Sequence, residues 1–539
     1  MNSEPIVRKL RLGLLLNSDK APAWVHAMLS DIAGSDYAEI VVVFKLDGKS
    51  EPASSGALRH RLLSYYLALD RSVACPKPNA VELCDTAEAL LGLPVVDLAA
   101  APHSFKNLGL ESVDLILCPG PAPANQQLAD ASRLGVWVCL QGGRHAQPDA
   151  PPGLSEMAQG SGLVASMIVQ LAGDGGAGRV IDQAFSKPDH LFVARTENHL
   201  LWKTVSLFTR NLRRLQQQGE KRFFERVSKQ YPSELVVDQQ VSGSVLGQLA
   251  SHLRRYLRLK RDFYWYSDHW GLLFDFDDEL SLSPEGFRPL RPPPGLEWAD
   301  PHVLYRDGKY YVFIEEVRLE TRKGHIAVFE LDENGNASPA VTIIDEPYHL
   351  AYPFVFEWRD DLWLIPDSRS NRSVDLYRCE EFPHRWVLHK TLMSNVDAVD
   401  STLLRHNDRW WMFTARVFHA GVRSSDDLCL YSCDDPTSDD WTEHPRSPVV
   451  SDVSRARPAG RILEQNGRLY RPAQICTPRY GYGIQLRRIE HLTPTHYEEV
   501  DDAKIEPNWD RGVVAVHTIA RTHRLTMLDA QFRRPRFAG

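Results

Sequence analysis

A motif that occurs four times in the second half of the chain constrains the fold more than any other feature of the sequence. Each copy has a small or polar entry, an apolar stretch, a turn that in two copies is Asp-Gly or Asn-Gly, and a second stretch carrying Tyr or Trp. The copies read WADPHVLYRDGKYYVFIEE, LAYPFVFEWRDDLWLIPDS, AVDSTLLRHNDRWWMFTAR and ARPAGRILEQNGRLYRPAQ, starting at Trp298, Leu350, Ala398 and Ala456. A period of about 50 residues with several strands per copy is typical of a β-propeller blade.

The number of blades follows from the spacing and from what flanks the repeats. The copies are 52, 48 and 57 residues apart when aligned at Pro301, Pro353, Ser401 and Pro458. A fifth unit can be assembled from DFYWYSDHWGLLFDF, starting at Asp262, and VVAVHTIARTHRLTML, starting at Val513. A ring closed by strands from both ends has no free sheet edge. We therefore predict a five-bladed β-propeller over residues 262–539.

The first part of the chain has a different pattern, and at 539 residues the chain is too long for one hydrophobic core. Over residues 1–185, short apolar runs alternate with the helix-like stretches 56–70 and 81–92, which predicts a Rossmann-like α/β domain with a largely parallel sheet. The expected strands are Leu12–Leu16, Ile40–Phe44, Val113–Cys118 and Val136–Leu140. No GxGxxG or Walker pattern follows the first strand.

A helical connector is expected between these domains, over residues 186–261. Its clearest helices are predicted at Asn198–Gln218 and Ser242–Lys260, and the second ends in the basic cluster HLRRYLRLKR. Residues 254–261 of this cluster suit either a peripheral membrane contact or a solvated helix face.

Composition narrows the classes of partner and compartment. Lys and Arg number 62 against 70 Asp and Glu, a net charge of −8, which disfavours nucleic acid as the main partner. No apolar run is long enough for a membrane span, and the eight cysteines are scattered. We therefore expect a cytoplasmic protein.

Polar side chains occupy two aligned columns of the repeat. The residues just before the matched Pro or Ser are Asp300, Tyr352, Asp400 and Arg457. The second strand carries, in register, Glu315, Asp367, Ala415 and Gln474, followed in two copies by Glu316 and Arg416. If the innermost strands line a central channel, these side chains converge on one mouth. Two carboxylates facing each other across a cleft are what glycoside chemistry needs.

The columns suggest individual roles. Asp300 and Asp400 would be base and charge stabiliser, and Arg457 would hold an anionic group of the ligand. Alternatively, both aspartates cap inner strands and pair with Arg457. We expect the remaining ligand contacts from Glu315, Asp367 and Gln474, from the aromatic residues Trp298, Tyr352 and Tyr480, and from His349 and His517. No spacing predicts a metal or cofactor site.

Residues 10 to about 218 resemble the N-terminal domain of the formyltransferase family, which includes methionyl-tRNA and sugar-amine formyltransferases. The similar segments are RLGLLLNS, SVDLILCPG, RLGVWVCLQGG and LAGDGGAGRVI. The family uses an Asn-x-His pair and an Asp before Ala-Gly. Here those positions hold Val138, Leu140 and Gly176, with Asp174 displaced by two residues. The resemblance therefore implies a degenerate domain in which formyl transfer is the least favoured activity.

Residues 262–535 resemble the propeller-like N-terminal region of glucosamine inositolphosphorylceramide transferases and, more distantly, family 43 glycoside hydrolases. The similar segments include WADPHV, EPYHLAYPFVFE, DAVDSTLL and RYGYGI. In those transferases a glycosyltransferase domain follows the propeller, whereas this chain ends at Gly539. Family 43 hydrolases use an Asp base, a second Asp that tunes acidity, and a Glu acid. Asp300 and Asp400 match the aspartates by blade position, and Glu316 or Glu315 is the candidate acid.

Together these observations favour a carbohydrate-active protein of surface-polysaccharide or glycolipid biosynthesis. The leading hypothesis is glycosyl transfer at the propeller mouth, with a sugar or nucleotide sugar as donor and a glycan or glycolipid as acceptor. The alternatives are an inverting glycosidase of the family 43 type and a non-catalytic glycan-binding scaffold. We expect no resident cofactor, and two copies of the chain could pair through the α/β domain.

Overall fold

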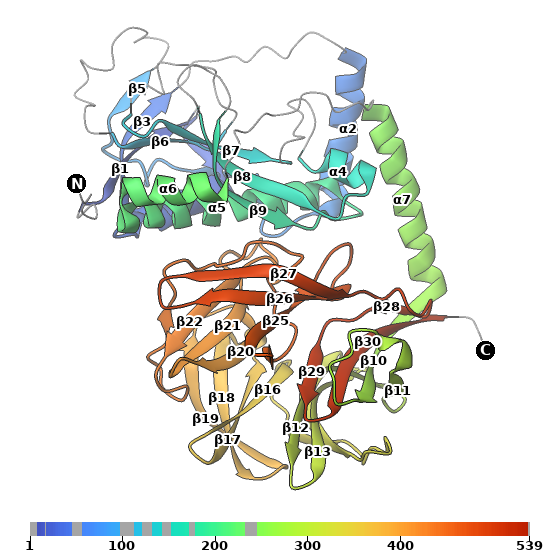
Figure 1. The fold of residues 1–539 in the computed structure, drawn as a ribbon. Coiled ribbons are helices and arrows are strands. Elements are labelled where there is room, and N and C mark those ends of the chain that lie inside the picture. The colour runs from blue at the N-terminus through green and yellow to red at the C-terminus, as the bar shows by residue number, and fades with distance from the viewer. Residues whose placement is uncertain are drawn as a thin grey trace. The chain divides into compact units, whose positions relative to one another are not determined.

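The computed structural model describes residues 8–16, 18–45, 57–97, 113–120, 132–142, 152–171, 178–231 and 245–536. These residues form two compact units (Figure 1). One comprises residues 1–257 with 419–422, and the other comprises residues 258–418 with 423–539. The three-part division at 185 and 261 stays a prediction.

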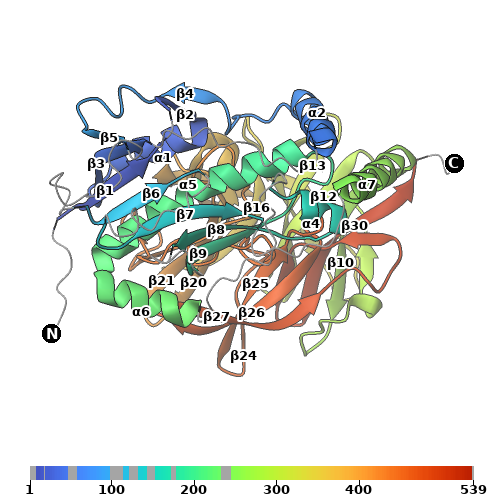
Figure 2. The ribbon, with the colours of Figure 1, turned by 90° about the horizontal axis from the view of Figure 1, so that it is seen from above.

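A seven-stranded sheet is the centre of the first unit. Its order is β5-β3-β1-β6-β7-β8-β9, parallel from β5 to β7 and antiparallel over β7, β8 and β9. Figure 2 shows β6 to β9 side by side. The strands span Val95–Asp97 (β5), Ala38–Lys45 (β3), Leu10–Leu15 (β1), Leu115–Cys118 (β6), Val136–Gln141 (β7), Val164–Gln170 (β8) and Arg179–Ser186 (β9). All four predicted strands are therefore confirmed, because their apolar runs form the core of a mostly parallel sheet.

The helices of this unit are α1 (Ala23–Ala33), α2 (Ala57–Ala74), α4 (Leu154–Gln159), α5 (Val193–Gln218) and α6 (Glu220–Gln230). Helix α5 packs on β8 and β9. A further helix, α7 (Val245–Trp265), runs from this unit into the second. The helices predicted at 56–70, 198–218 and 242–260 are confirmed as α2, α5 and α7. In the described part of the chain no helix is long and apolar enough to cross a membrane.

The helix predicted over residues 81–92 is wrong. This segment contains the short strand β4 (Leu83–Asp85), which pairs with β2 (Lys20–Pro22), and then turns. Asp85 Oδ1 accepts a hydrogen bond from the backbone N–H of Ala87, and the N–H of Thr86 donates to the carbonyl of Asp19. These contacts give the backbone an alternative to helical hydrogen bonds. The helical spacing of apolar residues does not reveal them.

Five antiparallel sheets form the second unit, which confirms the predicted five-bladed propeller (Figure 1). Four of them contain one repeat each. Blade 1 contains β12 (Leu296–Arg306), β13 (Lys309–Arg318), β14 (Lys323–Leu331) and β15 (Val341–Ile344). Blade 2 contains β16 (Ala351–Trp358), β17 (Asp361–Asp367), β18 (Ser373–Glu381) and β19 (Arg385–Ser394). Blade 3 contains β20 (Ala398–His406), β21 (Arg409–Arg416), β22 (Leu428–Cys433) and β23 (Thr442–Glu443). Blade 4 contains β24 (Leu463–Gln465), β25 (Arg468–Ile475), β26 (Gly483–Leu492) and β27 (Tyr497–Ile505).

The fifth sheet, the closing blade, joins strands from both ends of the propeller, as predicted. It contains β10 (Tyr266–Phe276), β11 (Arg288–Leu290), β28 (Val513–Ala515), β29 (Ile519–Thr522) and β30 (Leu525–Pro535). Strands β10 and β30 are antiparallel over their whole length, from Tyr266 opposite Pro535 to Phe276 opposite Leu525. This pairing holds the ring closed without an exposed edge between its first and last strands.

The turn inside each repeat is a two-residue hairpin. Both turn residues have positive φ in all four copies, which are Asp307-Gly308, Arg359-Asp360, Asn407-Asp408 and Asn466-Gly467. Two central residues with positive φ are the signature of a type I′ turn, whose twist matches that of the flanking strands. The Asp-Gly and Asn-Gly pairs in the sequence thus mark real hairpins.

A bulge in the innermost strand of blades 1 to 3 explains the Pro or Ser that aligns the repeats. Two residues of the inner strand face one residue of the second strand, at 300–301, 352–353 and 400–401. The first residue of each pair is left-handed, with φ of 49° at Asp300, 46° at Tyr352 and 54° at Asp400. Proline suits the second position because an unpaired bulge residue needs no N–H for the ladder. The bulge interrupts the alternation of the strand and re-aims the side chain of its first residue.

A buried ion cluster stabilises blade 4. Glu499 on β27 accepts two hydrogen bonds from Arg471 on β25, both of 2.8 Å, and one of 3.2 Å from Arg487 on β26. Burial alone would raise the pKa of Glu499, but Arg471 and Arg487 hold this pKa below its ordinary value. The cluster therefore links three strands of the blade.

We expect Glu499→Ala to destabilise the propeller, because it leaves the buried guanidinium of Arg471 without its carboxylate and removes one of the two carboxylates that pair with Arg487. Removing one partner of a buried pair costs about 3–5 kcal/mol. As a control, Glu330→Ala removes the exposed partner of Lys309 and should cost less than about 1 kcal/mol. The midpoints of urea unfolding of both variants measure the difference, and equal midpoints would contradict a stabilising role for the cluster.

Candidate functional site

A cavity of about 380 Å³ in the propeller is lined by four of the polar residues that the repeat singled out, Asp300, Glu315, Asp367 and Arg457. Its lining comes from all five blades and includes Trp270, Glu297, Asp300, Glu315, His349, Asp367, Arg369, Ser370, Arg457, Tyr480 and His517. Nine charged or titratable groups around one cavity are uncommon in a packed protein interior. Asp300 and Arg457 of the first column therefore line the same cavity.

The second column also lies in register, as predicted. Glu315, Asp367 and Ala415 stand opposite Ala299, Ala351 and Val399, one residue before each bulge. The N–H of Gln474 donates to the carbonyl of Arg457 at the matching place in blade 4. Glu315 and Asp367 line the cavity next to the bulge residues.

Asp300 is held at the cavity by the closing blade. Its backbone N–H donates to Asp529 Oδ2 at 2.9 Å, and Thr518 Oγ1 donates to Asp300 Oδ1 at 2.7 Å. In the described part of the chain no group bonds its second oxygen, Oδ2. The bulge and these two contacts fix a carboxylate that keeps one oxygen for a ligand.

His517 forms the wall beside Asp300. Its Nδ1 lies 2.6 Å from Asp529 Oδ2, and its Nε2 lies 3.6 Å from Asp300 Oδ1. Burial alone would lower the pKa of His517, but the carboxylates of Asp529 and Asp300 raise it to about 9. The ring stacks on Trp270 at 4.2 Å and meets the edge of Tyr480 at 5.5 Å. The wall is therefore an imidazolium between two aromatic rings.

Glu315 and His349 form a second pair at the cavity, with Nε2 of His349 3.0 Å from Oε1 of Glu315. The backbone N–H of Gly324 donates to Nδ1 of His349, which places the proton of a neutral imidazole on Nε2. Burial, with a contribution from the nearby Asp300, raises the pKa of Glu315 to about 7. His349 thus bonds one oxygen of Glu315, and this carboxyl group in turn raises the pKa of His349.

Asp367 and Arg369 line the side of the cavity formed by blade 2. Burial raises the pKa of Asp367, while the N–H of Arg369 donates to its Oδ1 at 2.8 Å. The Arg369 guanidinium lies 3.3 Å from Asp397 and is partly exposed. This side therefore offers both an acceptor and a cation to a ligand.

Asp400 and Arg457 pair with each other, which is the alternative that the sequence left open for them. Arg457 donates from Nε and a terminal nitrogen to the two oxygens of Asp400, at 2.5 and 3.1 Å, and from its other terminal nitrogen to Ser424. Gln474 Nε2 donates to the same carboxylate at 3.0 Å. Asp400 raises the pKa of Arg457, so the guanidinium stays charged. Asp400 is fully buried and lies behind Arg457, and only Arg457 lines the cavity.

Besides Asp400 and Gln474, three residues predicted for the site are not among the residues that line the cavity, namely Trp298, Glu316 and Tyr352. Trp298 donates to Glu316 at 2.7 Å and stacks on Phe329, and Glu316 also lies 3.0 Å from His325. Burial raises the pKa of Glu316, but the hydrogen bonds of His325 and Trp298 outweigh it and hold the pKa low. The hydroxyl of Tyr352 bonds Thr402 and the N–H of Gly460. Their internal partners account for all three polar groups.

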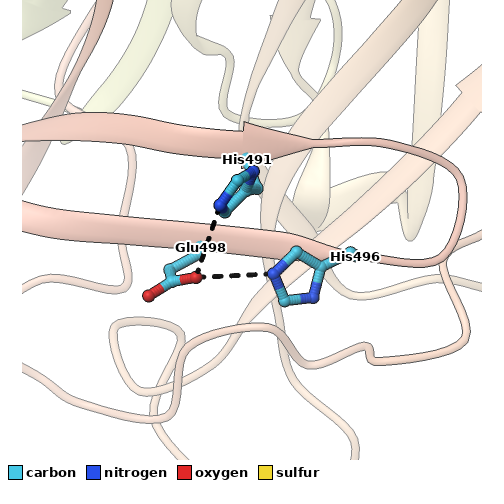
Figure 3. A group of neighbouring side chains, drawn as sticks. All are labelled: His491, His496 and Glu498. Carbon is cyan, nitrogen blue, oxygen red and sulfur yellow. Dashed lines mark ion pairs between the residues drawn. The ribbon is translucent and has the colours of Figure 1, made fainter.

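Among the described residues, two groups of side chains have ligand atoms close enough together for a metal ion. Asp300, His517 and Asp529 form the first, and there Nδ1 of His517 lies 2.6 Å from Asp529 Oδ2, as in an ion pair. The second is exposed and joins His491, His496 and Glu498 on the β26–β27 hairpin (Figure 3). Arg446 donates to Nδ1 of His496 at 2.8 Å, so that nitrogen is unprotonated, whereas a neutral imidazole binding a metal through Nε2 carries its proton on Nδ1. Both arrangements suit hydrogen bonds and ion pairs better than a metal ion.

Sequence reasoning missed several residues of the cavity. Trp270 lies in the weak fifth unit, where no repeat pointed to it, and Asp529 contacts the site only through the closure of the ring. Arg369 and Ser370 directly follow Asp367, so the end of the second strand was a signal that could have identified them.

Comparison with known proteins finds sequence similarity in the propeller region. Residues 294–532 match the family model described as glucosamine inositolphosphorylceramide transferase 1, N-terminal. The transferase of that name from Oryza sativa subsp. japonica is 33% identical over 205 residues, which are 38% of this chain and 27% of the relative. The one from Arabidopsis thaliana is 30% identical over 206 residues, with the same coverage. The chain thus spans about a quarter of the length of these relatives.

Among solved structures, the catalytic domain of a Coprinopsis cinerea GH62 α-L-arabinofuranosidase matches 43% of this chain and 90% of its own length, with 13% identity and a TM-score of 0.34. The resemblance of residues 10–218 to formyltransferases stays a prediction, and Asp174 and Gly176 lie outside the described residues. Over residues 294–532 the propeller is similar in sequence to the N-terminal region of glucosamine inositolphosphorylceramide transferases.

Proposed function

We propose that the propeller cavity binds a sugar and catalyses the making or breaking of a glycosidic bond. The observation that carries this proposal is the pair formed by Asp300 and Glu315. One carboxyl keeps a free oxygen, and the other has its pKa raised to about 7 at the same cavity. General acid–base catalysis of glycosyl transfer needs one carboxyl group in each role.

In this proposal Asp300 is the base. It removes the proton from the attacking hydroxyl group, while Glu315, protonated on the oxygen that His349 does not bond, donates a proton to the leaving oxygen. Asp400 does not contact the sugar, because it lies behind Arg457. Its role is to hold the Arg457 guanidinium at the cavity wall, where the positive charge balances the carboxylates.

The remaining lining suits a sugar ring. Trp270 and Tyr480 offer aromatic faces for the C–H groups of a pyranose. Asp367, Ser370 and Arg369 offer acceptors and donors for its hydroxyl groups. Such a mixture of aromatic surface and a few convergent polar groups is characteristic of small-molecule sites.

Two candidate functions differ in the molecule that accepts the sugar. Transfer to a glycan or glycolipid is the first, and the sequence relation to enzymes named as transferases supports it. Hydrolysis by inversion is the second, and the protonated Glu315 favours it, because a nucleotide diphosphate leaves without a proton donor whereas a sugar alcohol needs one. Cytoplasmic location and pairing of two copies stay predictions.

Asp300→Asn and Glu315→Gln should each lower turnover by about 10²-fold or more, the usual contribution of a general acid or base. Glu316→Gln is the matched control, since Glu316 does not line the cavity, and it should keep wild-type turnover. The measurement is a screen of nucleotide sugars and aryl glycosides, run with thermal shift to detect binding. Thermal stabilisation by a sugar without any turnover would instead make the protein a glycan-binding scaffold.

The two carboxyl groups can be told apart by the leaving group. Glu315→Gln should still cleave an aryl glycoside whose leaving group needs no proton. Asp300→Asn should be equally slow on substrates with good and with poor leaving groups. If both variants lose all substrates equally, Glu315 is not the acid.

Activity on substrates with poor leaving groups should fall as the pH rises through about 7. The acid must be protonated, and burial raises the pKa of Glu315 to about 7, so the protonated fraction decreases above that pH. A pH profile of kcat/KM measures this limb. A profile that stays level from pH 6 to 9 would argue against Glu315 in this role.

A further inference from the structure

Exposed aromatic and basic side chains gather where helix α7 meets the closing blade. Phe263, Tyr264 and Trp265 end the helix and are 63%, 63% and 58% exposed, and Tyr266 begins β10 and is 37% exposed. Basic residues surround them. We call this set the aromatic–basic patch, and it contains Arg258, Lys260, Arg261, Phe263, Tyr264, Trp265, Tyr266, Arg534 and Arg536.

Two distant segments of the chain are joined at the patch. Tyr266 stands opposite Pro535 in the β10–β30 ladder. Arg536 donates from its backbone N–H to the carbonyl of Trp265 at 2.9 Å and from Nε to the carbonyl of Tyr266 at 2.8 Å. Its guanidinium also lies over the ring of Phe263, 5.4 Å from the centroid. The end of the helix and the end of β30 are thus fixed to each other.

The charge of the patch is opposite to that of the whole chain. The chain carries a net charge of −8, whereas the patch holds five basic residues, and Asp262 is the acidic residue between them. Four consecutive aromatic residues exposed beside these cations are costly in water. The same combination is favourable at a bilayer surface, where Trp and Tyr lie at head-group level and Lys and Arg meet anionic lipids.

We propose that the aromatic–basic patch docks the propeller onto an anionic lipid surface. The aromatic rings would enter the head-group region, and the arginines and Lys260 would contact lipid phosphates. The basic cluster of the sequence indicated a membrane contact from charge alone. The structure adds the aromatic residues and the contribution of β30, and it shifts the centre of the contact toward the end of α7.

Docking at this place would bring lipid close to the cavity. Strand β10 carries both Tyr266 of the patch and Trp270 of the cavity lining, which are four residues, or about 13 Å, apart along the strand. Arg533 and Arg479 both bond Asp268, midway between them. An acceptor sugar carried by a lipid could therefore reach the cavity while its chain stays in the bilayer.

The test is co-sedimentation of the full chain with vesicles of phosphatidylcholine, alone or mixed with phosphatidylserine. We expect binding to the mixed vesicles, weakened by salt, and much weaker binding to phosphatidylcholine alone. Lys260→Glu/Arg261→Glu and Phe263→Ala/Trp265→Ala should each lower the affinity by about tenfold or more, given about 1 kcal/mol per basic residue near the surface. The matched control is Lys221→Glu/Arg222→Glu, the same charge change on α6, which should bind like the wild type.

Two controls keep lipid binding separate from folding and from catalysis. The variants should unfold at the wild-type urea midpoint, and Asp300→Asn should bind vesicles normally, so failure of the catalytic proposal leaves this one standing. The proposal is overturned if the wild type does not bind mixed vesicles or if both patch variants bind them as tightly as the control. Patch variants that change the mass of the particle in light scattering without changing vesicle binding would identify an interface between two copies instead.

Discussion

The carboxylate of Asp529 is the contact on which the candidate site depends. It lies on β30, fully buried, and accepts hydrogen bonds from the backbone N–H groups of Asp300, His517 and Thr518. Asp300 starts the bulge of blade 1, whereas His517 and Thr518 belong to the segment that returns to the closing blade. One buried acid therefore joins the first repeat to the end of the ring and fixes both the carboxylate and the imidazolium of the cavity wall.

Charge balance explains why so many ionisable groups can lie at one cavity. Buried charges are tolerated only when they are paired and hydrogen-bonded. Asp400 is paired with Arg457, and His517 is held between Asp300 and Asp529. Blade 4 uses the same device around Glu499, but there every oxygen of the carboxylate is bonded by protein groups. At the cavity Asp300 and Glu315 keep capacity for a ligand, and this difference separates a candidate site from a structural cluster.

The repeat predicted the propeller and part of the cavity, because blades 1 to 3 follow one local rule. The Pro or Ser of these blades is the second residue of a bulge whose first residue is left-handed, and the bulge presents Asp300 while the second strand presents Glu315 and Asp367. The sequence was less informative where contacts with other side chains decide whether a residue faces the cavity. Trp298 and Tyr352 occupy inner-strand positions but find partners inside the blades, and Glu316 points to His325 rather than to the cavity. The helix prediction for residues 81–92 was wrong for a related reason, since the backbone of this segment pairs with residues far away in the chain.

The sequence by itself determined the number of blades, the hairpin turns, the strands of the parallel sheet and the two columns of polar residues, because these depend on spacing and on local backbone preferences. Only the tertiary structure decided which members of the columns share a cavity, that burial raises the pKa of Glu315, and that Asp400 serves Arg457. It also brought Trp270 and Asp529 to the site and joined the aromatic end of α7 to β30. Protonation and pairing depend on burial and on charges from other blades, and these are set only when the ring closes.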